Sequence, residues 1–92
     1  MNYKIEKVLC LSLGTSAQSV KVAGLCCLVQ NNSDSATVYC KEKSDDGVAA
    51  TASNGYALGP GKETAVPFAA RELSLVAGAA STDVRVLILD TE

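Results

Sequence analysis

The chain has no histidine and no tryptophan, and it has only three tyrosines and one phenylalanine among 92 residues. Histidine is the commonest general base and the usual partner that activates a serine or cysteine nucleophile, so both arrangements are excluded. The absence of histidine and of any Cys-x-x-Cys pair leaves a zinc site without support. The composition therefore predicts a protein that is not an enzyme and that binds no cofactor and no metal ion.

Long apolar runs and blocks of one charge are also missing. Eight basic and ten acidic residues give a net charge of −2, and the basic residues form no run with interleaved aromatics. Nucleic acid is therefore not an expected partner. No window of about 20 apolar residues exists, so no membrane span is expected. The N-terminal "MNYKIEKVLCLSLG" carries Glu6 and Lys7 before a short apolar patch, which is typical of a strand and not of an export signal.

Two acidic residues and four cysteines remain as candidate chemical groups. Asp45 and Asp46 are adjacent, but their spacing does not fit a calcium loop, and their position before a glycine favours a solvated turn. The cysteines each lie in a strand-like apolar run, and two of them are adjacent, so that a strand must point them to opposite faces. We expect small, buried, reduced thiols in a protein that folds in a reducing cytoplasm. These cysteines are Cys10, Cys26, Cys27 and Cys40.

An alternation of period two is the dominant pattern, and it predicts strands. In the segment 3–13 one parity holds Tyr3, Ile5, Leu9, Leu11 and Leu13, whereas Lys4, Glu6 and Ser12 take the other. The segment 25–31, "LCCLVQN", is apolar at both parities, which predicts a central strand covered on each face. Val38 and Cys40 are expected to face one way and Tyr39 the other. "SVKVAG" and "DVRVLILD" add further strands with the same alternation.

The remaining segments predict turns and a long loop. The segment 42–61 is irregular and ends in "GPG", which favours a tight turn because glycine accepts a positive φ and proline fixes its own. "ETAVPF" then predicts a strand that Pro67 places at an edge or at a strand end. In "AARELSLVAGAA" a helix is the rival of a strand, but Leu73 and Leu75 alternate with Ser74, which favours the strand.

These elements predict an all-β fold. We expect residues 1–92 to form a single small antiparallel β-sandwich, jelly-roll or immunoglobulin-like, of about six to eight short strands. Residues 1–14 would add an extra edge strand or an arm onto a neighbour.

Tyr56 is the aromatic residue that no predicted strand requires. It follows Asn54-Gly55 in the long loop, where two roles are open. It could pack under the loop and close one end of the sandwich, or it could anchor a protein interface, since tyrosine offers a large contact area at low entropic cost.

The ordered segments resemble a known group of proteins. "GVAATASNGYALGPGKETAVPF" followed by "LSLVAGAASTDVRVLILD" is similar to small β-sandwich proteins encoded among the structural genes of tailed bacteriophages. The likeness also includes "CLVQNNSDSATVYC" and covers roughly residues 18 to 90. The motifs that carry it are turns and strand alternation, and no catalytic residue is among them.

This resemblance implies a role in the virion. The expected function is that of a capsid decoration or accessory protein, which binds the outside of the head and stabilises contacts between capsid subunits. The alternative is a tail, head–tail connector or fibre component, including a module that recognises a host surface or a carbohydrate. The major capsid protein or other virion proteins would be partners, the chain would form a homo-oligomer, and it would be made in the host cytoplasm. The candidate contact residues are Asn54, Tyr56, Leu58, Lys62, Tyr3 and Ile5.

Overall fold

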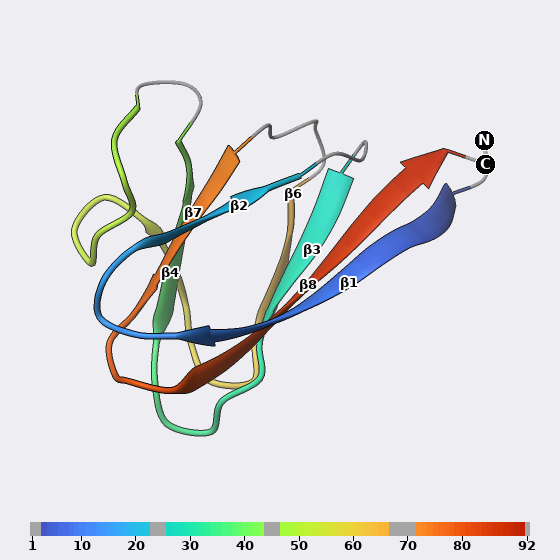
Figure 1. Ribbon diagram of the computed structural model, residues 1–92. Helices are drawn as coiled ribbons and strands as arrows, with labels where there is room; N and C mark the ends of the chain where they lie inside the picture. Colours follow the sequence, from blue (N-terminus) through green and yellow to red (C-terminus); the bar gives the residue numbers. More distant parts are fainter. Residues whose placement is uncertain (1–2, 23–25, 44–46, 67–71, 92) are drawn as a thin grey trace.

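The computed structural model describes residues 3–22, 26–43, 47–66 and 72–91, which form two four-stranded antiparallel sheets packed face to face (Figure 1). The strand order is β1-β8-β3-β6 in one sheet and β2-β7-β4-β5 in the other. The predicted all-β sandwich is therefore confirmed. The strands are β1 (Tyr3–Leu13), β2 (Gln18–Lys21), β3 (Cys26–Asn31), β4 (Val38–Glu42), β5 (Tyr56–Leu58), β6 (Glu63–Val66), β7 (Glu72–Ala77) and β8 (Thr82–Thr91).

The strand pairing is that of a jelly roll. The first strand pairs with the last, β2 with β7, β3 with β6 and β4 with β5, as in one long antiparallel ribbon. The ribbon is rolled up so that β3 also pairs with β8 and β4 with β7. Of the two expected architectures, the structure has the jelly roll and not the immunoglobulin arrangement. The first described residue, Tyr3, pairs with the last, Thr91, so β1 and β8 lie side by side up to these ends (Figure 1).

The core lies between the sheets and is built from one face of each strand. Alternation along the strands points these residues inward. Val38 and Cys40 are buried and Tyr39 is not, as predicted. The buried apolar cluster consists of Leu13, Val20, Val22, Cys27, Val29, Val38, Cys40, Leu58, Leu73, Leu75, Ala77, Val84, Val86 and Ile88.

The first strand corrects the prediction that Tyr3 to Leu13 keep one alternation. Ile5 pairs with Leu89 and Lys7 with Ile88, so Glu6 is an extra residue in a β-bulge. The extra residue reverses the alternation, so residues of the same parity face opposite sides of the sheet before and after the bulge. Ile5 therefore lies on the face opposite to Leu9, and its side chain is 64% exposed. Residues 3–13 form an edge strand that pairs with β8 along its whole length, and not an arm.

Two further strands differ from the prediction in which of their faces are buried. The strand β3 was expected to be covered on both faces, but Leu28 on its outer face is only half-buried and Gln30 is exposed. The strand β7 was expected to alternate, yet Ser74 has no exposed surface and Val76 is 7% exposed. The sheet that contains β7 is thus buried on both of its faces along this strand. The sheet that contains β3 is buried only on its inner face.

The turn from Gly59 to Lys62 has the predicted geometry. The Lys62 N–H donates to the Gly59 carbonyl at 3.1 Å, and Gly61 has a φ of 72°. Proline at the second position and a glycine with positive φ at the third define a type II turn. It leads into β6, which is an edge strand as predicted, while Pro67 lies outside the described residues.

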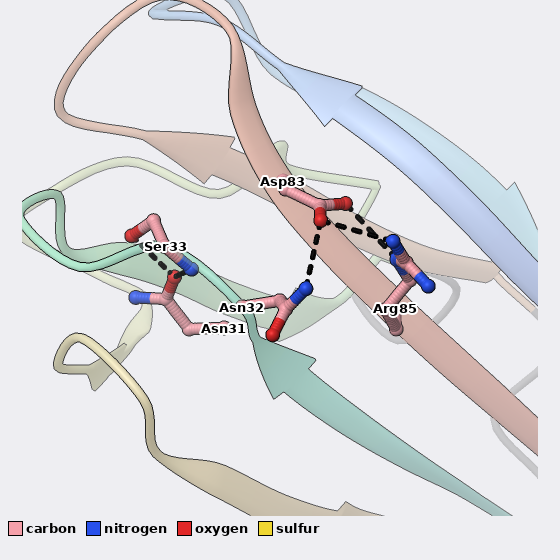
Figure 2. A network of polar contacts seen from close by, with 5 residues as sticks. All are labelled: Asn31, Asn32, Ser33, Asp83 and Arg85. Carbon is pink, nitrogen blue, oxygen red and sulfur yellow. Dashed lines mark hydrogen bonds and ion pairs between the residues drawn. The ribbon is translucent and has the colours of Figure 1, made fainter.

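A buried asparagine joins the end of β3 to the loop after it and to the end of β5, and Figure 2 shows its bonds to Ser33 in that loop. The Asn31 side chain is fully buried at the end of β3, and its Nδ2 donates to the carbonyls of Ala36 at 2.8 Å and Leu58 at 2.9 Å. Its Oδ1 accepts from the Ser33 N–H and hydroxyl at 3.1 and 2.7 Å. The amide therefore makes the two donor and two acceptor bonds that it can make, which joins β3, the loop after it and the end of β5.

Replacement of Asn31 by alanine should destabilise the fold strongly. The change leaves the buried Leu58 carbonyl without its side-chain donor, so we expect the free energy of unfolding to fall by about 2–4 kcal/mol. The adjacent Asn32 is exposed and supplies the matched control, because Asn32→Ala should cost less than about 0.5 kcal/mol. Urea unfolding of both variants measures the difference. Equal losses would show that the buried amide does not hold the loops.

Candidate functional site

The outer face of the β1-β8-β3-β6 sheet carries apolar side chains that no strand among residues 3–22, 26–43, 47–66 and 72–91 covers. All eight strands of the described chain belong to the two sheets, and these pack through their inner faces. Across the outer face Val8 pairs with Leu87, Leu87 with Leu28, and Leu28 with Ala65. The next row contains Ile5, Leu89 and Cys26. We name this surface the bare face, and it consists of Ile5, Val8, Cys26, Leu28, Ala65, Leu87 and Leu89.

The bulge at Glu6 brings the two exposed large apolar residues of the bare face together. Without it, Ile5 and Val8 would lie on opposite sides of β1, because they are three residues apart. With it, both face outward, at 64% and 52% exposure. Val8 also borders a shallow hollow of about 280 Å³ that is lined from all four strands. A monomer gains nothing from keeping such side chains in water, whereas an interface does.

One end of the same outer face is polar. We name it the polar end, and it consists of Cys10, Arg85, Gln30 and Glu63. Arg85 pairs with Cys10 on one side and with Gln30 on the other, and Gln30 pairs with Glu63. The Arg85 guanidinium donates from Nε to Asp83 Oδ1 at 3.0 Å and from Nη2 to Oδ2 at 3.1 Å. Three of the four residues in this row are charged or carry an amide, so the face has an apolar half and a polar half.

One carboxylate links the polar end to the β3 loop (Figure 2). Asp83 Oδ2 also accepts a hydrogen bond of 2.8 Å from Asn32 Nδ2. The bonds from Arg85 and then from Asn32 lower the pKa of Asp83, and the Asp83 carboxylate raises the pKa of Arg85 in turn. The ion pair therefore stays charged over the ordinary pH range, and it fixes where the guanidinium lies.

The corresponding face of the other sheet is covered along its central strand β7 by the chain itself. The loop before β5 crosses it, with Ala50 2% exposed, and the Ala50 N–H donates to Ser74 Oγ at 2.9 Å. Asn54 closes this loop, since its Oδ1 accepts from the Thr51 N–H at 2.6 Å and its Nδ2 donates to the Ala49 carbonyl at 3.1 Å. The two sheets thus differ within the described residues, because a loop lies over one outer face and no strand over the other.

The structure does not bring the predicted contact residues together. Tyr56 is 64% exposed, which excludes packing under the loop, and it begins β5 instead of lying in an irregular segment. Asn54 and Lys62 are exposed, the first as the loop closure and the second in the turn. Leu58 is 4% exposed and belongs to the core, so its side chain is not on a contact surface.

The two predicted residues of the first strand lie elsewhere. Ile5 is on the bare face, and Tyr3 begins β1 with only its backbone described. Sequence reasoning missed the other large members of the bare face, Val8, Leu28, Leu87 and Leu89. The signal for them was present, because the segments 25–31 and 84–89 have leucines at the parity opposite to their core residues.

The four cysteines are free thiols in differing surroundings. Cys27 and Cys40 are buried, as predicted, and adjacent Cys26 and Cys27 do point to opposite faces. Cys10 is exposed on the outer face beside Arg85, which corrects the expectation of a buried thiol. Burial, followed by the nearby Cys26 and Cys40, raises the pKa of the Cys27 thiol to about 11.

The described ranges offer no metal site and no membrane-spanning helix. No group of three or more acidic residues or cysteines there could hold a metal ion, and Asp45 and Asp46 lie outside those ranges. Among the described residues there is no helix that could span a membrane. No protein-family model, no curated protein and no solved structure matches the chain.

The raised pKa of Cys27 predicts a loss of stability in alkali. The folded chain holds this proton above the ordinary thiol pKa of 9.0, whereas the unfolded chain releases it there. The stabilisation is complete below pH 9 and is lost as the pH rises to 11, by an amount of order 2 kcal/mol. Urea unfolding at these two pH values should show a smaller decrease for Cys27→Ala than for the wild type. Cys10→Ala is the control and should keep the full decrease. The same slope for Cys27→Ala and wild type would contradict the assignment.

Proposed function

We propose that the protein is a non-enzymatic structural subunit of a bacteriophage particle, a capsid accessory protein that binds the outside of the head. The observation that carries the proposal is the bare face, with Ile5 and Val8 exposed on a sheet whose counterpart is covered by its own loop. An apolar face that the chain leaves open is suited to packing against other subunits. The resemblance to phage structural proteins gives the proposal its particular form.

The jelly roll is a suitable architecture for this role. Closure of the ribbon pairs most strand edges within the chain and leaves β1, β6, β2 and β5 as sheet edges. Such edges and loops are surfaces that neighbouring subunits can contact. In a shell, many copies of a weak contact act together, so each single contact need not be strong.

Tyr56 is proposed as a contact with the shell. It lies on β5, an edge strand of the sheet opposite to the bare face, and nearly two thirds of its side chain is exposed. Tyrosine anchors are common at the centre of protein interfaces. Recognition of a carbohydrate instead calls for an aromatic platform beside several amides and carboxylates, and Tyr56 is the only exposed aromatic side chain among those the structure describes.

Two measurements on particles test this function. Mass spectrometry of purified virions should detect the protein, and its absence from them would remove the proposal. Particles that lack the protein should then bind added wild-type chain, and Tyr56→Ala should bind several-fold more weakly because an anchor is lost. The matched control is Val48→Ala, since Val48 is also exposed, at 49%. Equal binding of both variants would exclude Tyr56 as the contact.

A further inference from the structure

The bare face and the polar end are complementary to a second copy of themselves. Along the strands the outer side chains form successive rows, from Ile5-Leu89-Cys26 through Val8-Leu87-Leu28-Ala65 to Cys10-Arg85-Gln30-Glu63. The first two rows carry no charge. The third has a cation on β8 and an anion on the edge strand β6.

A twofold axis that runs between β8 and β3, parallel to both, matches these rows. It places β8 of one copy over β3 of the other and β1 over β6, while each row stays at its own level. Leu87 then meets Leu28 of the second copy, and Val8 meets Ala65. Arg85 meets Gln30 and lies one strand away from Glu63, about 5 Å, which a guanidinium on its long side chain can reach.

The size of the face indicates how strong this contact is. Four strands about 4.8 Å apart and roughly seven residues of about 3.4 Å rise give roughly 450 Å² for each copy. The total of roughly 900 Å² lies below the standard interface of about 1,600 Å². Two copies would therefore associate reversibly, with a dissociation constant in the micromolar to millimolar range, and would pair most readily where they are concentrated.

We infer that the bare face and its polar end join two copies of this chain back to back, sheet on sheet, about this axis. The inference rests on the proposed role as an assembly subunit and names the first partner of that surface. Tyr56, on the opposite sheet, stays outside the contact and remains available to the shell. The four sheets of the pair would stack with the sheet-to-sheet spacing of about 10 Å that is usual for β-sandwiches.

Sedimentation velocity of the purified full chain tests the inference. Over a series from about 1 µM to about 1 mM, we expect a shift from monomer to dimer. A monomer at every concentration would overturn the inference without any variant being needed. A trimer or larger closed oligomer would overturn it as well, because a twofold contact of this face ends at two copies.

Substitutions locate the contact. Val8→Lys places a charge in the uncharged rows and should raise the dissociation constant at least about tenfold. Val48→Lys makes the same change at a side chain of similar exposure outside the bare face and should leave the dissociation constant unchanged. Circular dichroism checks that both variants are folded. Equal effects of the two changes, or none from Val8→Lys, would contradict the inference.

A charge reversal tests the axis itself. Glu63→Lys should weaken the dimer several-fold, since it sets a second cation opposite Arg85 of the other copy, and it should weaken the dimer less in an Arg85→Gln background, where that cation is gone. The same loss in both backgrounds would exclude this axis. The outcomes also separate the two proposals. A dimer whose chain is absent from virions leaves the inference standing and removes the function. A strict monomer found in virions does the opposite.

Discussion

The register of β1 on β8, with its bulge at Glu6, is the constraint on which the rest of the structure depends. These are the first and last strands, so their pairing forms the open end of the ribbon, and β8 also pairs with β3 where the ribbon rolls up. A slip of one residue would turn Leu9, Leu11 and Leu13 out of the core, because side chains alternate between the two faces. The bulge adds a local reversal, so that one strand supplies leucines to the core and places Ile5 and Val8 together on the outside.

The difference between the two outer faces connects this fold to function. On one sheet the loop before β5 lies over Ser74 and Val76, and the strand below it is buried from Leu73 to Ala77. On the other sheet the part of the chain that the structure describes provides no strand as a cover, and apolar rows reach solvent. The Arg85–Asp83 pair ends these rows with a fixed charge. This outer face is apolar in one half and polar in the other. It therefore fixes the position of a partner that packs on it, because a shifted partner would bury a charge.

The sequence predicted most of the fold and little of the site. The strand pattern, the type II turn at Gly59–Lys62 and the inward Val38 and Cys40 follow from local rules of alternation and turn chemistry. The bulge did not, because a single inserted residue leaves no local signal and is defined by the partner strand. The faces of β3 and β7 were assigned wrongly for a related reason. Whether an outward side chain is covered depends on a distant loop, as Ala50 over Ser74 shows.

The exposed thiol of Cys10 offers the most direct test of the central claim, which is that the outer face of the β1-β8-β3-β6 sheet is open in the isolated chain and covered by protein in the assembled state. Cys10 lies on this face beside Arg85. Its rate of alkylation can be followed by mass spectrometry in dilute chain, in concentrated chain and in particles. We expect rapid alkylation in the dilute chain and a rate several-fold lower in the other two. The same rapid rate in all three would contradict it.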